Sequence, residues 1–469
     1  MEKIKQLQEK LFDKKEYGFE IITEKEKEKI FKFNEEYIDF LNQCKTERRC
    51  TLFIEKYLKE NNFINIEETK TLNPGDKVYY INRKKSVYIA IIGTEKLEKG
   101  INFIGAHLDS PRLDLKPNPL YEDNGLALFK THYYGGIKKY QWVSIPLTIQ
   151  GVIVKPDGKT IDINIGEDDN DPIFTITDLL PHLAKNQNKK TLYSGIEGED
   201  LNLLIGSIPY KNEDIEEKVK FNILKILNQK YDIVERDLIS AELELVPAFK
   251  AKSLGFDYSM VAAYGQDDRS SVYTALRAIS EITNPKQTSV LILSDKEEIG
   301  SVGNTGMESH GFEVFIAEIL NKTNQNGYNV LDKTLSNSRM LSADVTSASD
   351  PTYESVDEKH NAAYLGKGIV LTKYTGSYGK NGASDANAEF VAYVRKILED
   401  NNLIYQMSDM GKVDEGGGGT IAYILANKGI DVIDCGVSVL SMHAPYEITS
   451  KFDIYNAYEF FKYFFKQNS

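Results

Sequence analysis

The chain has 469 residues, of which 41% are apolar and 27% are charged. This composition excludes an intrinsically disordered protein, and the length exceeds the roughly 100 to 200 residues of a typical domain, so we expect two or more domains. With 57 Lys and Arg against 70 Asp and Glu, the formal net charge is −13. A nucleic-acid partner is therefore disfavoured, because the average field of the protein repels phosphate.

The sequence predicts no membrane partner. No stretch sustains the roughly 20 apolar residues that cross a bilayer, and residues 1–20 lack the basic start and apolar centre of a secretory signal. The three cysteines, Cys44, Cys50 and Cys435, form no CxxC pair, and an odd number fits a reducing compartment. We expect a cytoplasmic location.

Residues 4–61 have the apolar spacing of helices with charged outer faces. Residues 77–81 and 86–92 then predict a β-hairpin, followed by a short strand at 101–105. The predicted buried stripe of the helices consists of Leu7, Leu11, Phe31, Phe33, Tyr37, Leu41, Phe53 and Leu58.

After Pro111 the pattern changes to β-branched alternation with frequent turn residues. The predicted elements are strands at 143–154 and 160–165, a helix at 219–232 and an extended segment at 238–247. We interpret residues 113–252 as a separate β-rich module.

From residue 258 onward, helical and strand patterns alternate along the chain. The predicted helices cover 270–282, 312–323, 387–400, 420–428 and 453–466, and the predicted strands cover 289–294, 369–372 and 431–434. This alternation predicts an α/β domain with a mostly parallel central sheet flanked by helices. We assign to it residues 1–112 and 253–469, with the β-rich module inserted between them.

Acidic residues and histidines follow several of these predicted strands. His107 and Asp109 come after the strand that ends at Gly105, and Glu297 and Glu298 come after the strand at 289–294. Asp267 precedes a helix, Asp344 lies in SAD, and His443 lies in SMHAP. Because ligand sites in open α/β sheets collect at the carboxyl ends of strands, these residues can converge in one crevice.

Histidines and carboxylates without a thiolate suit zinc, cobalt or manganese. A shared carboxylate such as Asp267 can hold two ions roughly 3.5 Å apart, and Asp109 can accept the second N–H of a ligating His107. Of the pair Glu297 and Glu298, one can bind metal while the other serves as a base. The same patterns also fit a surface histidine beside a turn aspartate, and a solvated acidic pair.

Six motifs in this order resemble the aspartyl aminopeptidase-like family of dinuclear zinc metallo-aminopeptidases. They are HLDSPRLDLKP, YGG with Trp142 after it, GQDDR, DKEEIGS, SADVTSASDP and SMHAPYE. The resemblance implies two divalent ions per chain, with zinc as the expected metal. The implied ligands are His107, Asp267, Glu298, Asp344 and His443. The resemblance also implies that Asp267 bridges the ions and that Glu297 is the general base. Asp109 is implied to accept a hydrogen bond from the ring nitrogen of His107 that does not bind metal.

The resemblance also explains the 160-residue interval between His107 and Asp267 (267 − 107), where the β-rich module falls. In this family a dimerisation domain is inserted into the catalytic domain, and dimers assemble into a dodecamer with an enclosed chamber. The chain is thus expected to form a homo-oligomer, a dodecamer built from dimers.

Lys373, His182 and Gly418 are candidates for substrate binding. Lys373 resembles the family lysine that meets an acidic substrate side chain, and Gly418 lies in a glycine run that offers N–H groups before the predicted helix at 420–428. The family's inserted domain presents a histidine to a neighbouring active site in a segment that LPHLAKNQ resembles. Asn186 stands at the matching position and His182 four residues earlier, so a preference for acidic N-terminal residues stays open.

The predicted function is hydrolysis of N-terminal residues from peptides with a free N-terminus, through a water activated by two bridged metal ions. Two alternatives remain open at this point. One is a two-metal deacylase or carboxypeptidase with a similar site, and the other is a catalytically inactive oligomeric shell on the same scaffold.

Overall fold

The computed structural model of the protein describes residues 2–12 and 16–467. Within this part of the chain, no helix combines the length and the apolar character needed to span a bilayer. The helices are α1 (Glu2–Leu11), α2 (Gly18–Ile21), α3 (Glu24–Gln43), α4 (Glu47–Glu60), α5 (Lys218–Tyr231), α6 (Gln266–Ser280), α7 (Gly311–Lys322), α8 (Val330–Ser336), α9 (Ala388–Asp400), α10 (Ala422–Ala426) and α11 (Lys451–Lys466).

The largest sheet has nine strands and is mostly parallel, as the alternating pattern predicts. Its spatial order is β1 (Ile64–Asn65), β2 (Lys77–Asn82), β3 (Ser86–Ile91), β14 (Ser289–Ser294), β4 (Asn102–His107), β15 (Arg339–Ala343), β21 (Asp431–Gly436), β17 (Ile369–Thr372) and β19 (Tyr405–Met407). The predicted hairpin is the antiparallel pair β2 and β3. In the middle of the sheet, β14, β4, β15 and β21 are parallel neighbours. The α/β class is confirmed.

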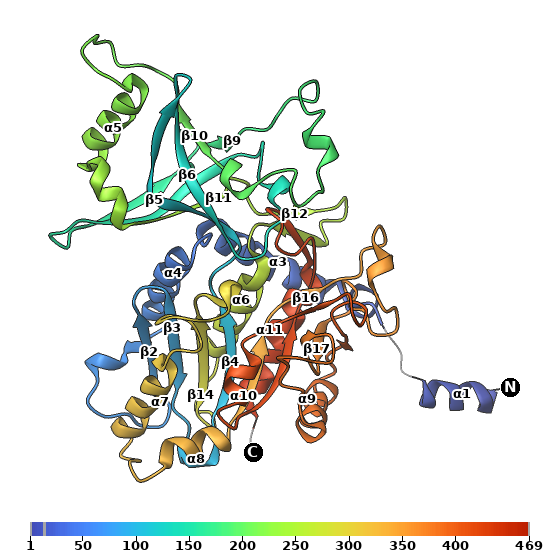
Figure 1. Ribbon diagram of the computed structural model, residues 1–469. Helices are drawn as coiled ribbons and strands as arrows, with labels where there is room; N and C mark the ends of the chain where they lie inside the picture. Colours follow the sequence, from blue (N-terminus) through green and yellow to red (C-terminus); the bar gives the residue numbers. More distant parts are fainter. Residues whose placement is uncertain (1, 13–15, 468–469) are drawn as a thin grey trace.

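Helices cover both faces of this sheet (Figure 1). Strand β14 shows why, because every one of its residues is buried and successive side chains point to opposite faces. Leu291 and Leu293 pack in the core that contains α6 and α11, whereas Val290 and Ile292 pack in the core that contains α7 and α10. A strand buried on both sides is typical of a parallel sheet between two helical layers.

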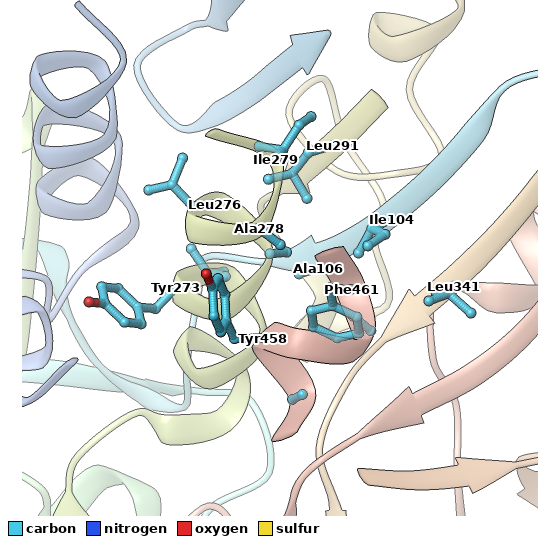
Figure 2. Packing of buried hydrophobic residues seen from close by; sticks show 14 of the residues in the cluster. Ile104, Ala106, Tyr273, Leu276, Ala278, Ile279, Leu291, Leu341, Tyr458 and Phe461 are labelled. Atoms are coloured by element: carbon cyan, nitrogen blue, oxygen red, sulfur yellow. The ribbon is translucent and has the colours of Figure 1, made fainter. Parts of the chain in front are cut away.

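The C-terminal helix α11 lies against α6 on one of these faces. Figure 2 shows Phe461 in the same buried cluster as Ile104 and Ala106 of β4 and Ala278 of α6. Phe461 is fully buried, as are its neighbours Phe460 and Phe464. The aromatic residues at the end of the chain therefore belong to the core of the sheet domain.

Replacing Phe461 with alanine should lower the free energy of unfolding by about 3–5 kcal/mol, because the lost ring leaves a cavity in a close-packed core. Thermal and denaturant unfolding of the purified chain measure this. The matched control is Phe256→Ala, since Phe256 is fully exposed and its loss should cost less than about 0.5 kcal/mol. Equal stabilities of the two variants would contradict the packing described for α11.

A second sheet of seven antiparallel strands forms the β-rich part of the molecule, at the top of Figure 1. Its order is β8 (Thr160–Ile165), β7 (Leu147–Val154), β11 (Ala241–Pro247), β5 (Arg112–Asp123), β6 (Leu126–Tyr134), β10 (Leu203–Gly206) and β9 (Thr175–Ile176). It has a core of its own, in which Trp142 is fully buried. The β-rich sheet is present where the sequence predicts it, and the boundaries 113 and 252 stay predictions.

A third sheet carries two segments of the candidate site. Its order is β12 (Lys252–Leu254), β13 (Met260–Ala263), β23 (Glu447–Ser450), β22 (Ser438–Leu440) and β16 (Thr346–Ser347). Strand β13 leads into α6, and the connection from β22 to β23 contains His443. The two short strands β18 (Gly376–Ser377) and β20 (Gly417–Gly418) form a separate pair.

Several expectations from the sequence are wrong in detail. The strand expected at 143–154 begins only at Leu147, and residues 238–240 of the expected extended segment belong to a 3-10 helix, Glu235–Ser240. Leu7 and Leu11 do not join the buried stripe, because they are 53% and 68% exposed on α1, which lies apart from the rest of the chain in Figure 1. The helix expected at 420–428 begins only at Ala422. The glycine run before it therefore does not lie at a helix N-terminus and is partly the strand β20.

Candidate metal centre

The predicted site residues lie at one edge of the central sheet. His107 is the last residue of β4, Asp344 directly follows β15, and Glu297 opens a short 3-10 turn after β14. Because β14, β4 and β15 are adjacent and parallel, their carboxyl ends meet. Asp267 arrives from the first turn of α6, and His443 from the connection between β22 and β23.

Asp267 lies between the two histidines. Its Oδ1 is 3.2 Å from Nε2 of His107, and its Oδ2 is 3.2 Å from Nε2 of His443. Each oxygen therefore faces a different imidazole. Asp267 is also buried, with 4% of the residue exposed. A carboxylate with its two oxygens turned to two separate nitrogen donors has the arrangement of a bridging ligand.

The remaining carboxylates lie around the two histidines. Asp344 Oδ1 lies 3.7 Å from Nε2 of His107, and Glu298 Oε2 lies 3.5 Å from Nε2 of His443. Glu297 Oε2 lies 4.0 Å from Nε2 of His107. Donor atoms of His107, Glu297 and Asp344 fall within 4.8 Å of one another, as do donor atoms of His107, Asp267 and Glu298. The structure thus brings all the residues predicted to bind metal together in one cluster.

The cluster fits divalent cations. Within residues 2–12 and 16–467, Oδ1 of Asp267 and Oε1 of Glu298 are buried and make no hydrogen bond, which is costly unless a cation satisfies them. Burial, followed by the charge of Asp267, raises the pKa of Glu298 well above its ordinary value. Burial also raises the pKa of Glu297 to about 8, against the opposing charge of His107. Crowded carboxylates of this kind disfavour their own ionisation unless a positive ion lies between them.

The negative charge of the carboxylates also raises the pKa of a histidine in the cluster. Burial alone would lower the pKa of His443, but Asp267 and Glu298 outweigh it and raise the pKa to about 10. The thiol of Cys435 also lines this region, and burial raises its pKa well above the ordinary value, so it stays protonated. Imidazole and carboxylate donors without a thiolate suit zinc, with cobalt or manganese as alternatives.

Backbone carbonyls orient both imidazoles. Nδ1 of His107 lies 3.1 Å from the carbonyl oxygen of Asp109, with the Asp109 carboxylate 3.4 Å away. Nδ1 of His443 lies 2.9 Å from the carbonyl oxygen of Gly136. An imidazole that donates its Nδ1–H in this way presents Nε2 as the free donor atom, and in both residues Nε2 faces Asp267.

Two buried carboxylates that the sequence reasoning missed hold the backbone of the site. Glu447 accepts the backbone N–H groups of Asp267 at 3.1 Å and of His443 at 2.8 Å. Asp268 accepts the backbone N–H of His107 at 3.2 Å. Both residues lie within motifs already singled out, GQDDR and SMHAPYE. Their spacing carried no signal for this role, because it depends on contacts between distant segments.

A cavity of about 560 Å³ opens beside the cluster. Asp267, Glu297, Glu298, Asp344 and His443 all contribute to its wall, and Glu297 is more open than Glu298, with 15% against 4% of its side chain exposed. The rest of the wall includes Met410, Met442, Thr346, Thr372, Thr375, Tyr423 and Asp434. The cluster is therefore accessible to a molecule of the size of a terminal amino acid with its neighbouring peptide group.

The predicted substrate residues are placed differently from one another. Gly418 lines the cavity. Lys373 does not, although Thr372 beside it does, and its Nζ lies 3.7 Å from Asp385. His182 and Asn186 are exposed on the β-rich part and do not line the cavity of their own chain.

The model of the family described as "Aminopeptidase I zinc metalloprotease (M18)" matches residues 40–465. The chain belongs to the M18 family of zinc metalloproteases. It is 54% identical over 447 residues to "Probable M18 family aminopeptidase 1" of Clostridium acetobutylicum, covering 94% of this chain and 96% of that protein.

Solved structures of M18 aminopeptidases have the same fold. The crystal structure of the M18 aminopeptidase from Thermotoga maritima superposes with a TM-score of 0.94 at 45% identity, over 97% of this chain and 100% of that one. The solved mApe1 dodecamer of S. cerevisiae has a TM-score of 0.75 at 23% identity, over 92% and 96% of the two chains, and shows the fold alone. The M18 chain described here is accordingly a metallo-aminopeptidase, a hydrolase of peptide bonds.

Proposed function

We propose that this M18 chain removes single residues from the free N-termini of peptides with the help of two divalent cations, and that the metal is zinc. The observation that carries the proposal is the position of Asp267, whose two oxygens face two different imidazoles at 3.2 Å each. The proposed ligands are His107, Asp267 and Asp344 for one ion and His443, Asp267 and Glu298 for the other.

Two cations bound in such a site polarise a carbonyl oxygen and lower the pKa of water towards roughly 7. Glu297 is then the general base, because its carboxylate borders the cavity and is more open than that of Glu298. It takes a proton from the attacking water and later passes it to the leaving amine. Asp109 supports this step, since its carboxylate accepts the backbone N–H groups of Glu297 and Glu298 at 3.1 and 3.2 Å.

The wall of the cavity favours an aminopeptidase over a carboxypeptidase or deacylase. Five carboxylates line it, and among the lining residues of the described chain none is Lys or Arg. A positively charged α-amine is attracted to such a wall, whereas a C-terminal carboxylate finds no cationic side chain there.

Blocked and free peptides separate these activities. Acetylation of the N-terminus of a test peptide should abolish cleavage, and amidation of its C-terminus should leave cleavage unchanged. The reverse pattern would replace the proposal with a carboxypeptidase. Measuring the metal content tests the alternative of a catalytically inactive oligomeric shell. About two zinc ions per purified chain would support the enzyme, and a chain that binds no zinc after reconstitution would support the shell.

The preference for acidic N-terminal residues depends on Lys373. If Lys373 turns from Asp385 towards the cavity to meet a substrate carboxylate, Lys373→Met should lower kcat/KM for a glutamyl amide about 10- to 100-fold and leave a leucyl amide unchanged. This range corresponds to the roughly 1.5–3 kcal/mol of a charge-assisted hydrogen bond. Steady-state kinetics on the two amides measure it.

The matched control is Lys380→Met, because Lys380 also pairs with Asp385, at 3.1 Å, and does not line the cavity. Its ratio of glutamyl to leucyl activity should stay that of the unmodified enzyme. If Lys373→Met leaves the ratio unchanged as well, the acidic preference is wrong, and the methionines and threonines of the wall indicate a neutral terminal residue.

We also propose that the chain forms a homo-oligomer through its β-rich part, residues 113–252, and that the complete assembly is a dodecamer built from dimers. The large apolar side chains exposed there support this: Leu179, Leu180, Leu183, Leu192 and Tyr193. The yeast relative described above is a dodecamer. Light scattering tests the proposal, and a monomeric mass at micromolar concentration contradicts it. The cytoplasmic location stays a prediction.

A further inference from the structure

The YGG motif, Tyr134-Gly135-Gly136, begins at the end of strand β6 of the β-rich sheet and contacts the proposed metal centre. Tyr134 is the last residue of β6 and pairs with Arg112 of β5 in the seven-stranded sheet. The proposed metal ligands all come from other parts of the chain, namely the central sheet, α6 and the connection from β22 to β23. The motif is therefore one place where the β-rich sheet reaches the cluster, beside residues 108–111, which connect β4 to β5.

Each residue of the motif touches a different part of the cluster. The Tyr134 hydroxyl donates a hydrogen bond of 2.8 Å to Oδ2 of Asp109, and the Gly136 carbonyl lies 2.9 Å from Nδ1 of His443. Gly135 has a φ of +74°, and a Cβ there would lie 3.3 Å from Cβ of Glu298. The backbone of the motif thus runs directly against the proposed ligands.

The contact of Tyr134 with Asp109 reaches three groups at once. The same carboxylate faces Nδ1 of His107 at 3.4 Å and accepts the backbone N–H groups of Glu297 and Glu298. A carboxylate has about four sites for hydrogen-bond donors, so the Tyr134 hydroxyl helps to fix which oxygen faces which donor. Asp109 is fully buried, and water cannot replace this hydroxyl without opening the site.

Tyr134 itself is held from the β-rich side. The guanidinium of Arg112 lies 3.9 Å from the centre of the Tyr134 ring. Arg112 in turn pairs with Asp114 at 2.9 Å and with Glu244 at 3.2 Å, on strands β5 and β11 of the same sheet. The ring therefore has a fixed position relative to the seven-stranded sheet.

We propose that Tyr134-Gly135-Gly136 is a positioning segment through which the β-rich sheet holds the metal ligands in their binding geometry, with Tyr134 acting through Asp109 and Gly136 through His443. This inference rests on the proposed two-metal function. Groups that orient metal ligands from behind typically contribute 10- to 100-fold to metal affinity. The β-rich part is then a component of the metal centre as well as a surface for assembly.

The test compares zinc affinity in full-length variants. Tyr134→Phe removes the hydroxyl and keeps the ring on Arg112, so zinc affinity measured by competition with a chromophoric chelator should fall about 10- to 100-fold. Excess zinc should restore most of kcat, whereas a loss caused by misfolding would not be restored by zinc. The matched control is Tyr133→Phe on the same strand, whose ring is partly exposed and which should bind zinc like the unmodified chain.

A second variant tests the other end of the segment. In Gly136→Ala the new Cβ would lie 3.3 Å from Nδ1 of His443, and the imidazole has to shift. We expect weaker binding of one of the two zinc ions. In the background of Asp109→Asn, Tyr134→Phe should cause little further loss of zinc affinity, because Tyr134 acts on the metal ligands through Asp109.

The outcomes separate this inference from the proposed function. If the unmodified chain binds two zinc ions and Tyr134→Phe binds them as tightly, the positioning role of Tyr134 is wrong and the two-metal function stands. If the unmodified chain binds no zinc and cleaves no free-amine peptide, the function itself is wrong. A loss of zinc affinity in Tyr134→Phe that is fully additive with Asp109→Asn overturns the path through Asp109.

Discussion

Glu297→Gln should lower kcat by about 10²- to 10⁴-fold and leave the zinc content of the chain unchanged. Glutamine keeps the size and the hydrogen-bonding shape of the side chain but cannot accept the proton of the attacking water. The side chain borders the cavity at 4.0 Å from Nε2 of His107, where a water next to the cations would lie within reach. Initial rates on a peptide with a free N-terminus, together with metal analysis of the same sample, measure the effect.

Two comparisons make this result specific to Glu297. Glu308→Gln is the matched control, because Glu308 accepts a hydrogen bond from Tyr423 of the cavity wall and has no contact with the cluster in the described chain. It should keep kcat within about twofold, the range of an ordinary surface change. Glu298→Gln should instead lose metal. A Glu297→Gln enzyme with a near-normal rate would remove the assigned base and leave the metal site intact.

The convergence of the proposed ligands could be predicted from the sequence because their residue types and their places after strands are local features. His107 and Glu297 follow apolar runs whose burial pattern marks a parallel strand, and such strands share one edge. The resemblance of the motifs supplied what spacing cannot, namely that Asp267, 160 residues after His107, faces the same point.

The supporting contacts could not be predicted in this way. Glu447 accepts the N–H of Asp267, which is 180 residues away in sequence, and Gly136 contacts His443 across 307 residues. Neither contact leaves a periodic pattern, because each depends on how separate sheets pack. The strands β13 and β15 were missed for a related reason, since short apolar runs next to loop residues do not differ from turns in a single sequence.

The error in α1 has a different cause. Helical periodicity predicts an apolar face, and α1 has one, but periodicity does not say what covers that face. In α3 the stripe residues Tyr37 and Leu41 meet the core, whereas Leu7 and Leu11 of α1 stay exposed. The pattern therefore predicts the type of an element more securely than its burial.

Removal of the proposed bridging carboxylate, Asp267, should have the second large effect. Asp267→Asn should reduce the zinc content from about two ions per chain to less than one, with peptide cleavage at background, because a neutral amide cannot place a negative oxygen on each of two cations. Elemental analysis of protein purified with added zinc measures the content. Circular dichroism checks that the fold is retained, since Glu447 still receives the backbone N–H of residue 267.

The comparison with terminal ligands decides whether Asp267 is a bridge. In the proposed assignment Asp344 binds the ion at His107 and Glu298 the ion at His443, so Asp344→Asn and Glu298→Gln should each lose about one ion and keep the other. Asp267 touches both imidazoles, and its loss should exceed either single effect. If Asp267→Asn retains one firmly bound ion, as Asp344→Asn is expected to do, each cation has its own ligands and the shared carboxylate is not what holds the pair together.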